Sequence, residues 1–178
     1  MNRWVFLAPV ALFALVVGGF ALGLGRDPSV LPSTLIGKPL PSFSLSPVRP
    51  GDPGLGSSQL AGKGGPRLLN VFGSWCVSCV YEHPVLMALK SQGVVIDGLD
   101  WKDKPADAIR FLKTQGDPYE RVGDDATGRA AIDLGVAAAP ETFVVDRAGR
   151  VRYKQVGPIT QQDWTSTIGP LMARLSRE

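Results

Sequence analysis

The feature that most constrains this chain is the pair Cys76 and Cys79, the only cysteines among its 178 residues. They lie after a mostly apolar run at 67–72, typical of a buried strand, and at the start of a run at 76–91, typical of a helix. A disulfide across so short a loop removes little entropy from the unfolded chain, so stability alone does not explain the pair. A C-x-x-C pair in this setting predicts a dithiol/disulfide redox site.

The charge of the chain argues against one class of partner. The formal net charge is +3, 20% of the residues are charged, and no run of five or more basic residues occurs. No motif typical of DNA or RNA binding appears, so we predict no nucleic-acid partner.

The N-terminal region from 5 to 25 has 21 residues without a charge. At about 1.5 Å per residue such a helix reaches roughly 30 Å, the thickness of a bilayer core. We predict that 1–25 is a cytoplasmic end and transmembrane signal anchor, 26–35 a tether, and 36–178 a folded domain. The alternative is a cleaved signal peptide, with a weak cleavage site at 19–21. Either segment exports the C-terminal domain; in a bacterium, the anchored form is a single-pass inner-membrane protein with that domain in the periplasm.

Strand-like and helix-like segments alternate beyond the tether. This alternation predicts an α/β fold, and a hairpin around the turn at 146–149 predicts a central mixed sheet flanked by helices. Thr160 is the expected N-cap of the last helix, with Asp163 in its first turn. The expected strands are 43–48, 67–72, 94–96, 119–122, 142–145 and 151–154, and the expected helices are 76–91, 105–114, 128–134 and 160–176.

The motif and the element order resemble the thioredoxin fold over roughly residues 36–178. Trp75 precedes the first cysteine, as in thioredoxins, and Pro84 stands eight residues after Cys76, where that family kinks its active-site helix. Pro140, before a strand, is similar to the cis-proline that faces the C-x-x-C pair in that family. The resemblance implies that Pro140 is cis and that it presents the Ala139 backbone to an extended partner segment.

A narrower resemblance is carried by the run 68–72 before the motif, Glu82-His83 after it, and the segment 135–143, which is similar to G-V-x-x-x-P-E-T-F. These resemble the membrane-anchored cytochrome c biogenesis proteins of the CcmG/DsbE family. The chain departs from many members in having Val77-Ser78 between the cysteines. The resemblance implies a protein-disulfide reductase that acts on apocytochrome c before haem attachment. Its implied partners are a membrane thiol reductase as electron donor and other cytochrome c maturation proteins.

The chemistry follows from the position of each sulfur. At the N-terminus of a helix, unpaired backbone N–H groups and the helix dipole favour the thiolate of Cys76, so we assign it as the attacking nucleophile. Cys79, one turn on and nearer the buried side, is the resolving thiol. We expect no cofactor beyond the Cys76–Cys79 disulfide and no metal, because zinc sites usually need four ligands and the chain has two cysteines and one histidine.

Further side chains are expected to support the pair. Trp75 is expected to shield the site and touch the partner. Glu82 and Glu141 either give the groove an acidic character, which would oppose the thiolate, or are solvated surface residues. Asn70, where ordinary thioredoxins have a buried aspartate, either holds a water or a backbone group beneath Cys79 or is a satisfied polar residue at a strand end. His83 is expected on the helix surface.

Two other functions remain open from the sequence. One is a general exported thiol:disulfide oxidoreductase without cytochrome specificity, with peroxide reduction as a minor variant. The other is a tethered, non-enzymatic binding module such as a haem or metal chaperone, which the lack of further ligands disfavours.

Overall fold

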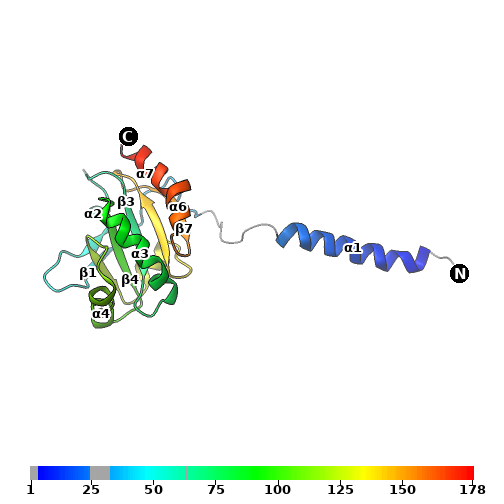
Figure 1. The fold of residues 1–178 in the computed structure, drawn as a ribbon, viewed down its shortest axis with the longest axis horizontal. Helices are drawn as coiled ribbons and strands as arrows, with labels where there is room; N and C mark the ends of the chain where they lie inside the picture. Colours follow the sequence, from blue (N-terminus) through cyan, green and yellow to red (C-terminus); the bar gives the residue numbers. More distant parts are fainter. Residues whose placement is uncertain (1–3, 25–32, 63) are drawn as a thin grey trace. The chain divides into compact units, whose positions relative to one another are not determined.

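The computed structural model describes residues 4–24, 33–62 and 64–178, which fall into two compact units, Met1–Leu31 and Pro32–Glu178. In the first unit, helix α1 runs from Trp4 to Leu24 (Figure 1). Among the described residues, no helix combines the length and the apolar character that a membrane span requires. The transmembrane anchor therefore stays a prediction. Most of the predicted tether, residues 26–32, lies outside the described residues.

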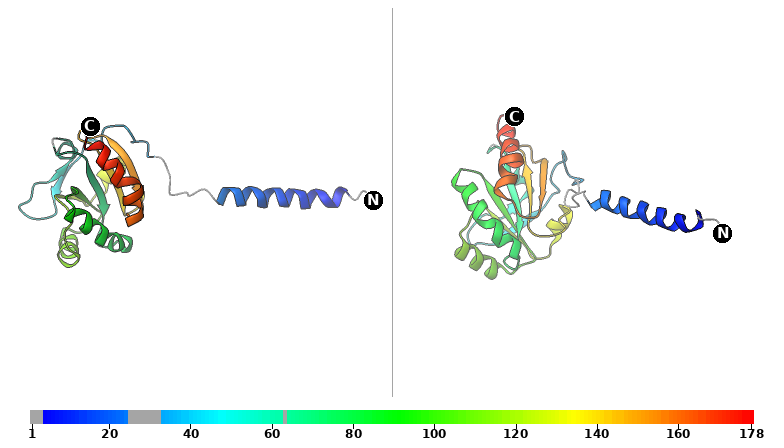
Figure 2. Two further views of the ribbon diagram at one scale, coloured as in Figure 1. Left: turned by 45° about the horizontal axis from the view of Figure 1, so that its top comes forward. Right: turned by 45° about the vertical axis from the view of Figure 1, so that its right-hand side comes forward.

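The second unit is built on one mixed sheet (Figures 1 and 2). Within residues 33–62 and 64–178, seven strands pair in the order β2-β1-β5-β4-β3-β6-β7. The central pairs β3–β4 and β4–β5 are parallel, and the outer pairs are antiparallel, which confirms the predicted mixed sheet. The strands are β1 (Ser44–Pro47), β2 (Leu55–Gly56), β3 (Arg67–Phe72), β4 (Ile96–Trp101), β5 (Val122–Asp125), β6 (Glu141–Val145) and β7 (Val151–Val156).

Helical segments flank this sheet, and most strands and helices of this unit match the predicted ones, although β2 and α2 were not predicted. Thr160 caps the last helical stretch, and its capping box with Asp163 is present. That stretch contains a π-helical turn, η1, in its middle. The helical segments of this unit are α2 (Ser57–Leu60), α3 (Val77–Ser91), α4 (Pro105–Gln115), α5 (Arg129–Asp133), α6 (Gln161–Asp163), η1 (Trp164–Ile168) and α7 (Gly169–Leu175).

Central strand β3 shows why its sequence is a continuous apolar run. Leu68 and Phe72 belong to a core cluster that includes residues of α3, α4 and α7, whereas Leu69 and Val71 belong to a second cluster with residues of α2 and α5. Both faces of the strand are thus buried, so alternation with polar residues is lost. Asn70 stands two residues from both Leu68 and Phe72 and therefore shares their face, the one covered by α3.

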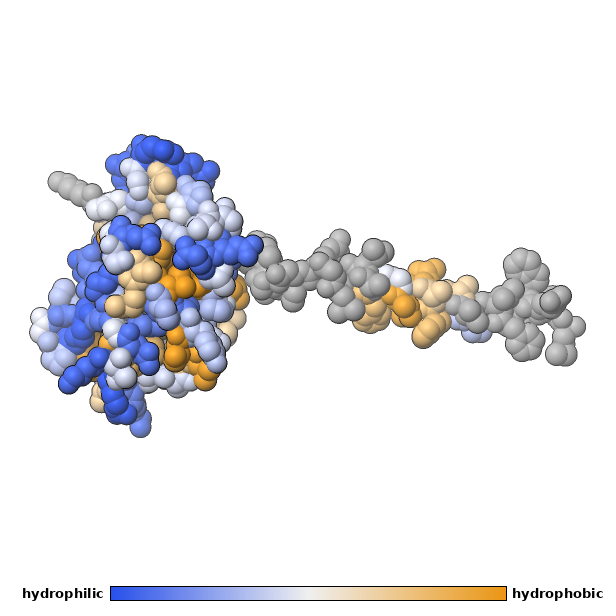
Figure 3. Space-filling model, viewed as in Figure 1, coloured by the Kyte–Doolittle hydropathy of each residue, from blue (hydrophilic) through white to orange (hydrophobic). Residues whose placement is uncertain are grey.

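Two predicted strands were displaced in sequence. The strand expected at 94–96 is β4, Ile96–Trp101, and the one expected at 119–122 is β5, Val122–Asp125. The apolar criterion missed most of β4 because the strand carries Asp97 and Asp100, and both are buried. Figure 3 shows that the visible face of the second unit is mostly hydrophilic, with hydrophobic residues in smaller patches.

Candidate active site

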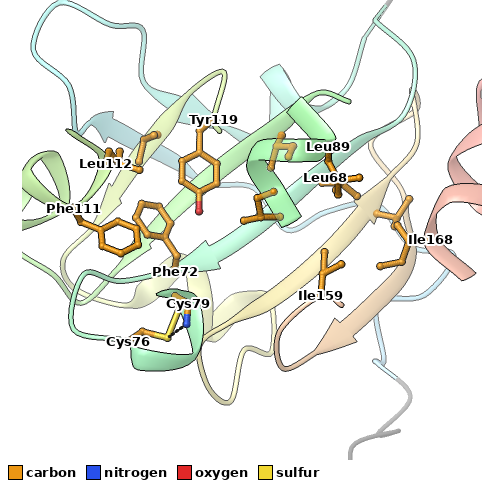
Figure 4. Close-up of a cluster of buried hydrophobic side chains, with 14 of the residues drawn as sticks. Leu68, Phe72, Cys76, Cys79, Leu89, Phe111, Leu112, Tyr119, Ile159 and Ile168 are labelled. Atoms are coloured by element: carbon orange, nitrogen blue, oxygen red, sulfur yellow. Dashed lines mark hydrogen bonds between the residues drawn. A yellow bond between two sulfur atoms is a disulfide. The ribbon is translucent and has the colours of Figure 1, made fainter. Parts of the chain in front are cut away.

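Cys76 and Cys79 form a disulfide at the start of α3, with their Cα atoms 5.3 Å apart (Figure 4). Cys76 is the N-cap residue, and its Sγ accepts a hydrogen bond from the backbone N–H of Cys79 at 3.1 Å. This is the arrangement that favours negative charge on a sulfur, because the N–H groups of the first helical turn have no partner within the helix.

An attacking sulfur must be reached by its partner, yet Cys76 is only 4% exposed and Cys79 only 2%. In this oxidised state both cysteines pack in the core cluster that also contains Phe72. A partner protein must therefore bind to the residues around the pair before its disulfide can react with Cys76 Sγ.

Exposed large side chains lie next to the buried pair in the sequence. Trp75 is 51% exposed and Tyr81 is 76% exposed, and Val77 and Val80 are also exposed. The Trp75 indole donates a hydrogen bond to the Trp101 carbonyl at 3.2 Å. Trp75 is thus fixed at one edge and open to contact, as its predicted role requires.

The Ala139–Pro140 peptide bond is cis, as the resemblance implied. Pro140 directly precedes β6, which pairs antiparallel with β3, with Glu141 opposite Val71. Because β3 leads into the cysteine motif, this pairing brings the cis-proline to the same end of the sheet as the disulfide. Ala139 packs against the core cluster that contains both cysteines.

Glu82 is not a solvated surface residue, one of the two alternatives left open by the sequence; it is 1% exposed. Its Oε1 accepts a hydrogen bond from Asn70 Nδ2 at 2.9 Å, and its Oε2 accepts one from the Ile159 backbone N–H at 2.9 Å. Burial raises the pKa of the Glu82 carboxyl to about 7, and these two hydrogen bonds oppose the rise. Glu82 therefore exchanges a proton near neutral pH.

Asn70 lies within β3 and not at a strand end, and its side chain does not hold a backbone group as one prediction had it. Its amide contacts three side chains: Nδ2 donates to Glu82 and to Thr142 Oγ1, both at 2.9 Å, and Oδ1 accepts from the Tyr119 hydroxyl at 2.7 Å. Asn70 is thus the centre of a buried polar network on the face of the sheet that α3 covers.

Glu141 is also fully buried, so the solvated alternative is wrong for it as well. Its Oε2 lies 2.8 Å from Lys154 Nζ, and its Oε1 accepts a hydrogen bond from the Ala137 backbone N–H at 3.1 Å. Lys154 also donates to the Gly135 carbonyl at 2.8 Å. Paired in this way, Glu141 braces the loop before Pro140 and does not give the site a free negative charge.

His83 was predicted on the helix surface, and this prediction was wrong. The residue is buried, its Nε2 lies 2.8 Å from the Gly116 carbonyl oxygen, and its ring packs edge-on against Phe111. Burial lowers the pKa of His83, although Gly116 and the charge of Asp117 oppose the effect. The helical periodicity alone did not show that α4 would cover this side of α3.

Sequence reasoning missed Tyr119 and Thr142 as members of the site. Neither residue type stands out in the sequence, and only the folding of β3, β6 and the segment before β5 brings them to Asn70. Across the part of the chain that the structure describes, no group of three or more His, Cys, Asp or Glu residues is placed to hold a metal ion.

Comparison with known proteins agrees with this geometry. A family model described as Redoxin matches residues 35–168. The thiol:disulfide interchange protein DsbE of Pseudomonas aeruginosa is 44% identical over 178 residues, covering 100% of this chain and 98% of that protein. This chain belongs to the DsbE family of thiol:disulfide interchange proteins. The resemblance seen in the sequence is therefore confirmed.

Other matches place this DsbE-family chain among related redox proteins. The thiol:disulfide interchange protein HelX of Rhodobacter capsulatus is 39% identical, covering 95% of each chain. A solved structure described as a DsbE from Chlorobium tepidum is 26% identical, with a TM-score of 0.61 over 77% of this chain and 95% of that one. A secreted thiol-disulfide isomerase from Corynebacterium glutamicum shares the fold. It is 22% identical, with a TM-score of 0.65 over 78% of this chain and 86% of that one. The DsbE-family chain is thus a thioredoxin-like thiol:disulfide oxidoreductase.

Proposed function

We propose that this protein reduces the disulfide of apocytochrome c in the periplasm before haem is attached, while a membrane anchor holds it at the inner membrane. The observation that carries the redox role is the Cys76–Cys79 disulfide at the N-terminus of α3 in a chain of the DsbE family. The cytochrome c substrate is supported by the resemblance of 68–72, Glu82-His83 and 135–143 to the cytochrome c biogenesis branch.

The reaction begins with the reduced protein. The Cys76 thiolate attacks one sulfur of the partner disulfide, which forms a mixed disulfide and releases the other partner sulfur as a thiolate. Cys79, as a thiolate, then attacks Cys76 Sγ, and the bond between Cys76 and the partner breaks. The partner leaves with two thiols after protonation, and two electrons have passed from the Cys76–Cys79 pair. The Cys76–Cys79 pair would then be left in the disulfide form, the form it has in the structure.

The second step requires that Cys79 lose its proton. Glu82 follows Cys79 by three positions in α3, so the two side chains lie on one face of the helix, and both are buried. Because burial brings the pKa of Glu82 to about 7, its carboxylate is a suitable acceptor for that proton. We assign Glu82 as the general base for Cys79.

Regeneration and location complete the proposal. A membrane thiol reductase would reduce the Cys76–Cys79 disulfide, and other cytochrome c maturation proteins would receive the reduced apocytochrome.

The anchor is supported by the uncharged run from 5 to 25. Alkaline extraction of membranes, followed by N-terminal sequencing, tests it: an extractable chain that starts after residue 21 would show a cleaved signal peptide instead.

The substrate is tested by trapping partners in cells. Cys79→Ala cannot resolve the mixed disulfide, so we expect it to retain apocytochrome c through Cys76, whereas the Cys76→Ala/Cys79→Ala control retains nothing. A broad set of unrelated exported proteins in the trap would indicate the general oxidoreductase instead. A clean deletion strain should lack c-type cytochromes, and normal cytochrome content without added reductant would contradict the cytochrome role.

A further inference from the structure

We propose that Tyr119 is a positioning residue for thiol exchange: its hydroxyl fixes the Asn70 amide so that the amide N–H faces Glu82, three residues after Cys79 in α3. This inference rests on the proposed role of Glu82 as the base for Cys79. It adds a residue outside the C-x-x-C motif, from a segment that no motif in the sequence singles out.

The contacts form one continuous chain of hydrogen bonds. The Tyr119 hydroxyl donates to Asn70 Oδ1 at 2.7 Å, and Asn70 Nδ2 donates to Glu82 Oε1 and Thr142 Oγ1, each at 2.9 Å. All four residues are buried, and they come from β3, α3, β6 and the segment before β5. In a site closed to water, each of these groups depends on its protein partner.

The donor and acceptor roles in this series of hydrogen bonds follow from the chemistry of the groups. An ionised carboxylate only accepts hydrogen bonds, so Asn70 stabilises the Glu82 anion only when Nδ2 points toward it. The amide oxygen then points the opposite way and requires a donor. Among the described contacts of Oδ1, Tyr119 supplies that donor. Burial raises the pKa of Tyr119 well above its usual range, with the charges of Glu82, Asp117 and Asp100 adding to the effect, so the hydroxyl keeps its proton.

The surroundings of the Tyr119 ring hold the hydroxyl in place. The ring stacks on Phe72 with centroids 4.8 Å apart, and Figure 4 shows it beside Phe72 in the cluster that contains both cysteines. Gly98 in β4 makes room for it, since a Cβ at that position would lie 2.9 Å from Phe72 and 3.0 Å from the Tyr119 ring. The hydroxyl therefore cannot easily move away from Asn70.

Removing the hydroxyl leaves Asn70 Oδ1 buried without a donor and frees the amide to turn. A turned amide presents its oxygen to Glu82, which repels the carboxylate and favours its protonated form. We therefore expect Tyr119→Phe to raise the pKa of Glu82 by on the order of one unit, which corresponds to about tenfold in the ionisation constant. The titratable groups around the network are Cys79, Tyr119, Asp100 and Asp117, and none of the cysteines titrates in the oxidised state.

Carbon-13 NMR of glutamate carboxyls in the oxidised full chain, held in detergent, measures this shift without any partner or exchange. The Glu82 signal is assigned by its loss in Glu82→Gln. We expect a higher midpoint in Tyr119→Phe and an unchanged one in Tyr153→Phe, which loses a hydroxyl that contacts Gln155 instead. An equal midpoint in wild type and Tyr119→Phe would overturn the proposal.

A second variant keeps the test decisive if Tyr119→Phe folds poorly. Asn70→Ala removes the amide itself, so it should raise the Glu82 midpoint at least as far, and Tyr119→Phe should add nothing in the double variant. If the two substitutions raise the Glu82 midpoint additively, Tyr119 does not act through Asn70 and the proposal is overturned. Resolution of a mixed disulfide with a small thiol should show its pH profile displaced upward in Tyr119→Phe. An unshifted profile alongside a shifted Glu82 midpoint would instead refute Glu82 as the base, which is the proposed function and not the positioning.

Discussion

Asp100, near the end of β4, is a carboxyl group whose replacement should stabilise the protein. The residue is fully buried, and among the described residues no donor group forms a hydrogen bond to either carboxylate oxygen. Burial raises the pKa of Asp100 to about 8, and the nearby charges of Asp103 and Asp124 add to the rise. The folded state therefore binds a proton at Asp100 that the unfolded chain releases.

The magnitude follows from proton linkage. An unfolded aspartate has a pKa of about 3.9, so between about pH 4 and pH 8 the folded state binds more protons and stability falls as the pH rises. At about 1.4 kcal/mol per unit, keeping Asp100 protonated costs on the order of 4 kcal/mol at pH 7 and almost nothing at pH 4. Asp100→Asn retains the shape and removes the ionisation. The free energy of unfolding of Asp100→Asn minus that of wild type should therefore be about 4 kcal/mol larger at pH 7 than at pH 4.

Denaturant unfolding of the oxidised unit Pro32–Glu178 at several pH values measures this difference. Asp146→Asn provides a matched control of opposite sign. Burial would raise the pKa of Asp146, but hydrogen bonds from the Arg150 and Ala148 backbone and from Arg152 outweigh it, so the pKa is lowered. Asp146→Asn should therefore lose stability at pH 7, and its deficit should shrink as the pH falls below about 4. A constant difference between Asp100→Asn and wild type from pH 4 to pH 8 would refute the reasoning.

Three further substitutions test the packing and the brace of the site. Phe72→Ala removes a buried ring and should lower the free energy of unfolding by about 3–5 kcal/mol in the same assay. Thr160→Ala removes the capping box and should cost about 1 kcal/mol, whereas Thr165→Ala in the following turn should cost less; equal losses would contradict the capping role. Lys154→Met leaves the Glu141 carboxylate buried without its cation and should cost about 3–5 kcal/mol, and an added Glu141→Gln should recover part of this loss.

Sequence reasoning was sound where the physical signal is local. The spacing of Cys76 and Cys79, the apolar run before them and the N-cap at Thr160 all act over a few residues, and each predicted its element correctly. The bounds of β4 were harder, because its buried aspartates look like surface residues in a pattern of hydrophobicity. Their burial depends on the strands beside them, which the pattern does not contain.

The sequence by itself determined the chemistry of this protein: two sulfurs three positions apart at the start of a helix can join to each other and exchange with a partner, whatever surrounds them. Only the tertiary structure decided which groups serve that pair. Glu82, His83 and Glu141 are polar residues of a kind usually exposed to water, and the sequence left the exposure of the two glutamates open. The burial of Glu82, its proton affinity and its link to Tyr119 through Asn70 arise because segments 12 to 77 residues apart meet on the face of the sheet that α3 covers. Glu141 shares a face with Phe143 and is buried on the other side of the sheet.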